Sequence, residues 1–233
     1  MILQTFFGTG LDEIPKALSP KEHGYLFLIG TLILGSFFIL AFAKSLNLKV
    51  YAVLVQLVGN SNNIAQKMKE SHRLFSTSSI LLLVNYLLMS AVCLYLFNDY
   101  LQLYPSWFEL LLGLGLPPIL LLLQLTPPFI VNWITNAKMP MPTITGITIV
   151  GLQFTGLLLT VVALLWALNP RWGYYFLFAF LLIVVLSQTV RLFKNSFVLL
   201  GAGVSWYYIL LYFCTLEILP LFVAFYYLRM NFL

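Results

Sequence analysis

Charged side chains are scarce in this chain of 233 residues, where Asp, Glu, Lys and Arg together make up 8% and hydrophobic residues 61%. A soluble domain carries roughly 25% charged residues. The chain therefore lacks the polar side chains that a globule in water needs on its surface, and an ordinary soluble protein is excluded. The composition predicts an all-α, polytopic membrane protein, because backbone groups in lipid must be satisfied within each helix.

Cysteine and histidine are also few, with two of each. Cys93 and Cys214 both fall inside apolar runs, so the sequence favours neither a disulfide framework nor a C-x-x-C metal site. His23 and His72 lie near opposite membrane faces in the topology that we predict, so they do not form a joint metal site. The chain also lacks the H-E-x-x-H and G-x-S-x-G motifs. We therefore expect no enzyme activity, no cofactor and no bound metal.

Long apolar runs are what the chain has in abundance. A bilayer core of about 30 Å requires about 20 residues of helix, and six runs are long enough: residues 24–43, 76–97, 106–135, 142–168, 172–190 and 205–228. The sequence predicts one membrane domain over residues 1–233 with about six transmembrane helices. The third run is too long for one straight span, and we expect Pro117-Pro118 and Pro127-Pro128 to kink or break it.

Basic residues gather at the ends of these runs, which indicates membrane topology rather than nucleic-acid binding. With the N-terminus outside, the outer segments hold Lys16, Lys21, Arg171 and Arg229. The inner segments then hold twice as many, at Lys44, Lys49, Lys67, Lys69, Arg73, Lys138, Arg191 and Lys194. By the positive-inside rule, we predict a periplasmic segment at residues 1–23, a basic cytoplasmic loop at residues 44–75 and a periplasmic C-terminus.

Two segments have the composition of interfacial helices. Within the basic loop, residues 50–59 are apolar but too short to span a membrane, and residues 64–73 are basic and amphipathic. Such a helix lies on anionic headgroups or forms a docking surface for a cytoplasmic partner, and both interpretations stay open. Residues 191–203 begin with basic residues and end with glycines, and we predict a second interfacial segment there.

An acidic residue, Glu217, stands inside the apolar run 205–228. It lies about twelve residues from the inner end of that run, which places it about 18 Å deep at 1.5 Å per residue. An ionised carboxylate at that depth costs several kcal/mol, so we expect it to be protonated or hydrogen-bonded within the bundle. No Lys or Arg falls at that depth in the six predicted spans, so we expect no salt bridge within the chain. Pro220 frees the carbonyl of Leu216 beside it.

Neutral polar residues are predicted at the level of Glu217 in other spans. Asn85, Gln153 and Thr31 lie about ten to twelve residues from the inner ends of their runs, and Gln124 is level too if the third run ends near residue 135. We hypothesise a buried polar layer in which these groups hydrogen-bond between helices, each bond contributing about 0.6–2 kcal/mol. Three roles stay open for Glu217, namely a packing group, a contact for a partner's basic residue, and a proton or ion site.

Small residues predict a close helix contact in the fourth run. Gly151 and Thr155 form a small-xxx-small pair there, a pattern that lets helices approach closely within a chain or between chains.

The closing run SWYYILLYFCTLEILPLFVAFYYL, residues 205–228, resembles a family of integral membrane proteins from Bacteroidota that is described as a domain of unknown function. The resemblance rests on the core LY-x-C-T-LEILPL at residues 211–221. It implies a diderm bacterium and its inner membrane. It implies no activity, substrate or cofactor.

The expected function follows from size, charge and the predicted polar layer. We predict a non-enzymatic subunit or scaffold of a bacterial envelope complex. The alternative is a small transporter or proton-coupled permease that uses Glu217. The expected partners are the lipid bilayer and other membrane or envelope proteins, with no nucleic acid, and a homo-oligomer stays open.

Overall fold

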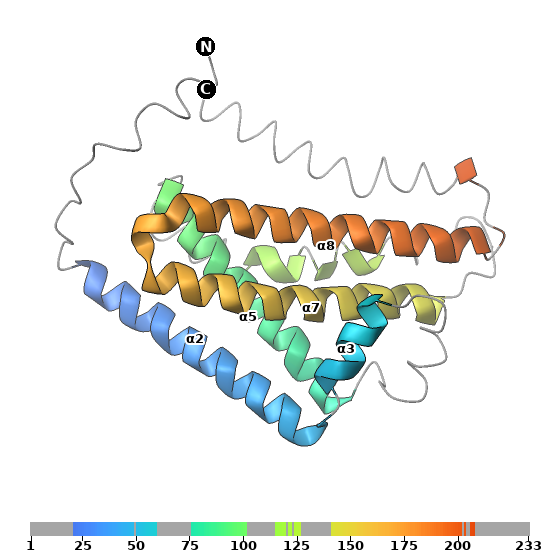
Figure 1. Ribbon diagram of the computed structural model, residues 1–233, viewed down its shortest axis with the longest axis horizontal. Coiled ribbons are helices and arrows are strands. Elements are labelled where there is room, and N and C mark those ends of the chain that lie inside the picture. The colour runs from blue at the N-terminus through green and yellow to red at the C-terminus, as the bar shows by residue number, and fades with distance from the viewer. Residues whose placement is uncertain are drawn as a thin grey trace, which may run out of the picture.

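The computed structural model describes residues 21–48, 50–59, 76–101, 115–119, 121–122, 124–126, 141–201, 203 and 206–207. All regular secondary structure in these ranges is helical, which confirms the all-α class. The helices in chain order are α2 (Lys21–Leu46), α3 (Val50–Gly59), α5 (Thr77–Leu101), α7 (Met141–Leu168), the 3-10 turn η1 (Pro170–Trp172) and α8 (Gly173–Gly201) (Figure 1).

Four of the described helical segments are long and apolar enough to cross a membrane. They are Phe27–Leu46, Thr77–Tyr100, Met141–Leu168 and Pro170–Gly201, of 20, 24, 28 and 32 residues. They correspond to the first, second, fourth and fifth predicted runs. A shorter apolar helix, Gly115–Thr126, falls in the third run. Almost all of the sixth run, residues 205–228, lies outside the described residues. Residues 1–20 of the predicted outer segment and residues 60–75 of the predicted basic loop also lie outside them.

Helix α8 corrects one prediction about the basic segments. It runs without a break from Gly173 to Gly201, so the separate interfacial segment predicted to begin at residue 191 is wrong. Basic residues are good helix formers, and no proline or glycine interrupts α8 before its last residue. The helix ends instead at a glycine turn, where Gly203 has a φ of 80° and its N–H donates to the Leu200 carbonyl at 3.0 Å.

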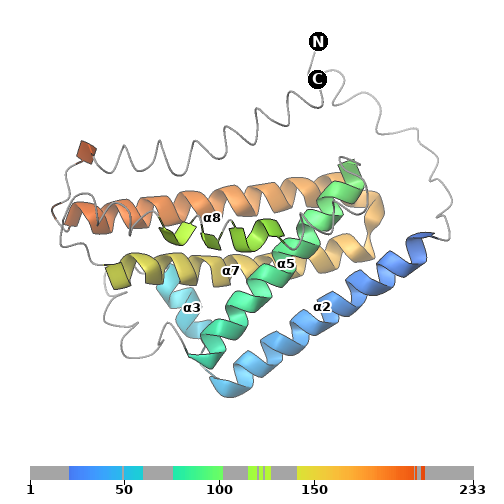
Figure 2. The same ribbon diagram turned by 180° about the vertical axis from the view of Figure 1, so that it is seen from behind.

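The first proline pair lies close to the start of a described helical segment. Residues 115–119 are helical through both Pro117 and Pro118, and Pro117 is buried. Proline is tolerated in the first turn of a helix, where its missing N–H has no intrahelical partner. Residues 106–114 of the third run lie outside the described residues, so the kink or break expected at this pair stays a prediction. Figure 2 shows this short helix between α7 and α8. Pro127 and Pro128 lie outside the described residues.

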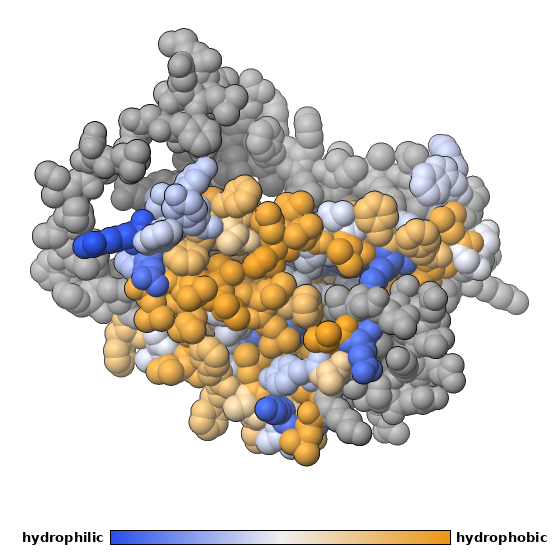
Figure 3. Space-filling view, viewed as in Figure 1, coloured by the Kyte–Doolittle hydropathy of each residue, from blue (hydrophilic) through white to orange (hydrophobic). Residues whose placement is uncertain are grey.

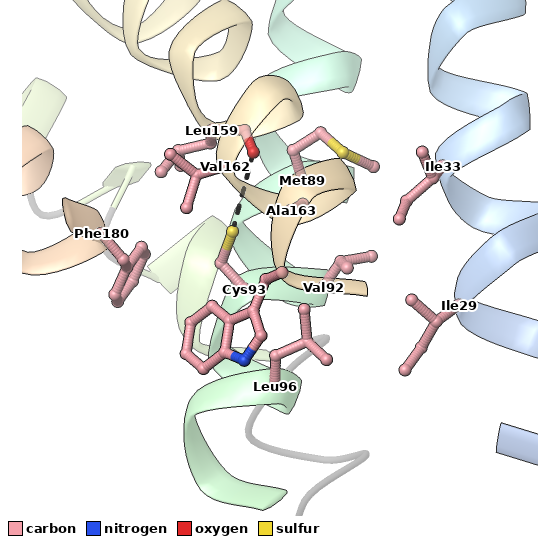
Figure 4. Packing of buried hydrophobic residues seen from close by; sticks show 11 residues of the cluster. Ile29, Ile33, Met89, Val92, Cys93, Leu96, Leu159, Val162, Ala163 and Phe180 are labelled. Atoms are coloured by element: carbon pink, nitrogen blue, oxygen red, sulfur yellow. Dashed lines mark hydrogen bonds between the residues drawn. The ribbon is translucent and has the colours of Figure 1, made fainter. Parts of the chain in front are cut away.

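Helix α7 is the centre of the bundle. It packs against α5 and α8, while α2 packs mainly against α5 (Figures 1 and 2). One hydrophobic cluster gathers around Trp166, where the first halves of α2 and α8 meet the second halves of α5 and α7. Its other members are Ile29, Ile33, Met89, Val92, Cys93, Leu96, Leu159, Val162, Ala163 and Phe180. Figure 4 shows Cys93 at its centre, with its thiol directed at the Leu159 carbonyl 3.9 Å away.

A second hydrophobic cluster closes the other end of the bundle. It joins the end of α2, helix α3 and the starts of α5 and α7 through Ala43, Val50, Leu54, Leu82, Ile147 and Val150. Helix α3 is therefore packed against the bundle by its apolar side chains. The Tyr51 hydroxyl also donates to the Leu40 carbonyl at 2.7 Å. Burial raises the pKa of Tyr51, which keeps its phenol neutral and able to donate.

These two clusters fix the direction of each helix. We call the two ends of the bundle the Lys44 end, which also holds Arg191 and Lys194, and the Trp166 end, which also holds Asp99 and Arg171. Helices α5 and α7 both run from the Lys44 end to the Trp166 end, and α2 and α8 run the opposite way. The chain between Leu101 and Met141 therefore connects opposite ends of the bundle.

Candidate functional site

Asn85 links three helices at the middle of the bundle. Its side chain on α5 is completely buried. The Ser36 hydroxyl of α2 donates to Asn85 Oδ1 at 2.5 Å, and Asn85 Nδ2 donates to Thr160 Oγ1 of α7 at 3.2 Å. The Thr160 hydroxyl in turn donates to the Gly156 carbonyl at 2.9 Å. A buried amide with both ends engaged fixes how the three helices are aligned, because sliding any helix would leave a polar group unpaired.

Gln153 forms a second polar contact, between α7 and α5. It is also completely buried, and its Nε2 donates to both the carbonyl and the hydroxyl of Ser79, at 2.9 Å and 2.6 Å. Gln153 lies seven residues before Thr160, which is about 10 Å along α7. Asn85 and Gln153 therefore occupy two separate levels with different partners, and the single layer hypothesised from counting residues is corrected to two contacts.

The remaining members of the hypothesised layer have different outcomes, and Thr31 is the one that the structure places away from these contacts. Thr31 is exposed, and its hydroxyl donates to the Leu28 carbonyl of its own helix at 2.8 Å. Gln124 Oε1 is buried and has no hydrogen-bond partner among the described residues. Glu217 and Pro220 lie outside the described residues.

The closest helix approach is at Gly156 rather than at Gly151. A Cβ atom added to Gly156 would lie 2.8 Å from Tyr86 Cα and 2.9 Å from Tyr86 Cβ, whereas one added to Gly151 would meet nothing within 4 Å. Thr155 does lie at a contact, because its hydroxyl hydrogen-bonds Ser187 of α8. Within the chain, Thr155 meets α8 while Gly151 lines an open groove, and a contact between chains at Gly151 stays a prediction.

That groove lies between α7 and α8. It forms a cavity of about 220 Å³. The described residues that line it are apolar except for two hydroxyls, of Thr155 and Ser187, and two basic side chains, of Arg191 and Lys194. Seven of the inner basic residues are predicted from the sequence to form a cytoplasmic basic surface: Lys44, Lys49, Lys67, Lys69, Arg73, Arg191 and Lys194. Arg191 is 6% exposed, so it is not part of an open surface. Lys44 is exposed at the same end of the bundle, and the other predicted surface residues, Lys49, Lys67, Lys69 and Arg73, lie outside the described residues.

The described residues hold no group of three or more His, Cys, Asp and Glu side chains that could bind a metal ion. A family model described as "Domain of unknown function (DUF4271)" matches residues 29–228. The chain belongs to this family. Comparisons with curated proteins and with solved structures found no match.

The match to DUF4271 covers all of α3, α5, α7 and α8, and α2 from Ile29 onward. It includes both polar contacts, the Gly156 approach, the groove and the run that contains Glu217. The expectation of a family described as a domain of unknown function is confirmed. Its bacterial lineage and the LY-x-C-T-LEILPL core as a family motif stay predictions.

Four residues that build the contacts of this DUF4271 chain were missed at the sequence level: Ser36, Ser79, Gly156 and Thr160. A usable signal was present in α7, where Gln153, Gly156 and Thr160 follow one another at spacings of three and four residues. Residues at these spacings share one helix face, so a polar and small-residue stripe marks the side of α7 that meets α5.

Proposed function

We propose that this DUF4271 protein is a non-enzymatic subunit or scaffold of a bacterial envelope complex in the inner membrane. The supporting observation is how the buried polar side chains are used. Asn85 and Gln153 are completely buried, and their side chains form hydrogen bonds with residues of neighbouring helices. Groups held in this way keep a bundle in one arrangement, and a rigid bundle offers its outer faces to partners.

The outer faces of the described bundle are broad and apolar, as Figure 3 shows for one side. The most exposed large side chains on α2 are Phe27, Leu34 and Phe38. Those on α8 are Tyr175, Phe178, Val185, Phe193 and Phe197. In a membrane such side chains contact lipid tails or the helices of another protein. We propose both lipid and another membrane protein as partners. The apolar faces of α2 and α8 are long enough for a second membrane protein to pack on one of them while lipid covers the rest.

The proposed topology has six spans with both termini in the periplasm. Helices α5 and α7 run in the same direction, so the chain between them must cross the membrane an odd number of times if both helices span it. The apolar helix Gly115–Thr126 supplies residues for that crossing, and the run 205–228 supplies the sixth. The Lys44 end, with Arg191 and Lys194, is cytoplasmic by the positive-inside rule.

The test is a pull-down of the tagged, full-length protein from its native membrane in a gentle detergent, read by mass spectrometry. We expect stoichiometric recovery of other envelope proteins. As the matched control, solubilised membranes of unlabelled tagged cells are mixed with those of isotope-labelled untagged cells before the pull-down. True partners are then recovered only in the unlabelled form of the tagged strain. Recovery of the protein alone would overturn the proposal. Glu217→Gln and pH-dependent uptake in liposomes would then test the permease alternative.

A further inference from the structure

The groove between α7 and α8 is basic toward the Lys44 end. The two helices run antiparallel and side by side (Figure 1), and the hydroxyls of Thr155 and Ser187 hydrogen-bond each other across their contact. Four residues nearer the Lys44 end, Gly151 of α7 is level with Arg191 of α8. A Cβ atom added to Gly151 would meet nothing within 4 Å, so the groove is open at this level. Lys194, three residues farther along α8, lines the same end.

The rest of the groove is apolar, and its length matches one leaflet of a membrane. The lining runs over residues 147–158 of α7 and 183–194 of α8, which is about 16 Å along each helix at 1.5 Å per residue. Half of a hydrocarbon core of about 30 Å is about 15 Å. Toward the Trp166 end the described lining is formed by apolar side chains such as Leu158, Ile183 and Leu186. The groove therefore has the length and the polarity that suit one acyl chain of one leaflet.

Aromatic side chains indicate where the membrane surface lies along α8. Trp172 and Tyr175 are exposed beside the start of this helix, and such side chains gather at membrane interfaces. A hydrocarbon core takes about 20 residues of helix, and this length counted from Gly173 ends near residue 192. Arg191 and Lys194 lie on either side of that position. They are therefore level with the boundary between hydrocarbon and headgroups, and the apolar part of the groove extends from them into the hydrocarbon.

We propose that this groove binds one anionic phospholipid of the leaflet at the Lys44 end. Its phosphate lies between the guanidinium of Arg191 and the ammonium of Lys194, because these are the side chains that bind phosphate best. One acyl chain follows the apolar lining toward the Trp166 end. Basic pockets between membrane helices bind anionic headgroups in this way. A zwitterionic phospholipid brings a cation of its own to the two basic side chains, so the site prefers a headgroup with net negative charge, such as that of phosphatidylglycerol.

The site requires no protein partner, so it is tested by photolabelling the purified, full-length protein in phosphatidylcholine vesicles. The probe is a trace of phosphatidylglycerol that carries a diazirine in one acyl chain, and labelled residues are located by mass spectrometry of peptides. We expect labelling at Phe154, Leu158 and Leu186. Unlabelled phosphatidylglycerol should compete with the probe, whereas inorganic phosphate should not. Competition by inorganic phosphate would show a site for a free anion and would overturn the proposal.

Phe38 of α2 serves as the reference for ordinary lipid contact, because it is 80% exposed. The same labelling is repeated with a phosphatidylcholine probe that carries the diazirine at the same place. The ratio of groove labelling to Phe38 labelling should be higher for the phosphatidylglycerol probe. Equal ratios for the two headgroups, or no labelling in the groove, would overturn the proposal.

The basic end of the site is tested by removing one charge at a time. Lys194→Gln removes a cation from the groove, and the matched control Lys44→Gln removes an exposed cation from the same end of the bundle. A basic residue at a membrane surface contributes about a fivefold preference for anionic lipid. We therefore expect Lys194→Gln to lower the groove labelling by about fivefold, while Lys44→Gln stays near wild type. Equal losses in the two variants would refute the role of the groove.

The open space beside Arg191 is tested by filling it. Gly151→Leu places a side chain in the groove and should remove the labelling. Gly35→Leu is the matched control, because a Cβ atom at this glycine of α2 also meets nothing within 4 Å. Labelling that is equal in the two variants would contradict the site. Where a variant does not accumulate, the competition measured on the wild-type protein decides between the outcomes.

Discussion

Adding one methyl group at Gly156 should separate α5 from α7. The new Cβ would lie 2.8 Å from Tyr86 Cα, 2.9 Å from its Cβ and 3.1 Å from its backbone nitrogen. These atoms belong to the helix backbone or are fixed to it, so no rotamer change relieves the clash. An ordinary contact begins near 3.4 Å, so the helices must move apart by about 0.6 Å, which already forfeits about a quarter of each dispersion contact across the interface.

The separation also reaches the neighbouring polar contact. Asn85 Nδ2 and Thr160 Oγ1 are 3.2 Å apart, and the same shift lengthens that hydrogen bond beyond a useful distance. Overpacking costs about 1–3 kcal/mol, and an interhelical hydrogen bond in a membrane protein contributes about 0.6 kcal/mol. We therefore expect Gly156→Ala to lower the free energy of unfolding by about 2–3 kcal/mol.

The assay is equilibrium unfolding in mixed micelles of mild detergent and dodecyl sulfate, followed by circular dichroism. Gly151→Ala is the matched control, because it makes the same chemical change in the same helix but meets nothing within 4 Å. Any gain in helix propensity is then common to both variants. If the stabilities of Gly156→Ala and Gly151→Ala agree within about 0.5 kcal/mol, the close approach of α5 and α7 is refuted.

Four further changes test the polar contacts in the same assay. Asn85→Leu and Gln153→Leu should each lower the free energy of unfolding by about 1–2 kcal/mol, since each leaves buried partners unpaired. Thr31→Ala should stay within about 0.5 kcal/mol of wild type because its hydroxyl is exposed. A destabilising Thr31→Ala or a neutral Asn85→Leu would contradict these expectations. Tyr51→Phe removes the donor to the Leu40 carbonyl. Because burial raises the pKa of Tyr51 above its ordinary value of 10.0, the wild-type advantage should be full below pH 10 and decline as the pH rises through the higher folded pKa. An advantage that is unchanged at higher pH would argue against the contact.

The sequence predicted the positions of four spans well, because length and hydropathy decide whether a segment crosses a membrane. It also singled out Asn85 and Gln153, since an amide deep inside an apolar run must find a partner. It did not identify Ser36, Ser79 or Thr160 as partners, because hydroxyl groups can also bond their own helix, as Thr31 does.

Arg191 and Gly151 show where residue type alone misleads. A basic residue after an apolar run is usually a span end, yet α8 continues ten residues beyond Arg191. Glycine in a membrane helix suggests close packing, yet the small residue that meets a neighbouring backbone is Gly156. Both outcomes depend on which face of a helix meets its neighbour, and that is decided by tertiary packing.

The proposed six-span topology depends most directly on α5 and α7 crossing the membrane in the same direction. The measurement is labelling of single cysteines by a membrane-impermeant thiol reagent in intact spheroplasts, with both native cysteines replaced by alanine. Four exposed positions serve as reporters: Asp99, Arg171, Lys44 and Pro142. Asp99→Cys and Arg171→Cys should react from outside, while Lys44→Cys and Pro142→Cys should react only after lysis. If Asp99→Cys and Pro142→Cys react from the same side, the two helices run in opposite directions and the proposed topology is contradicted.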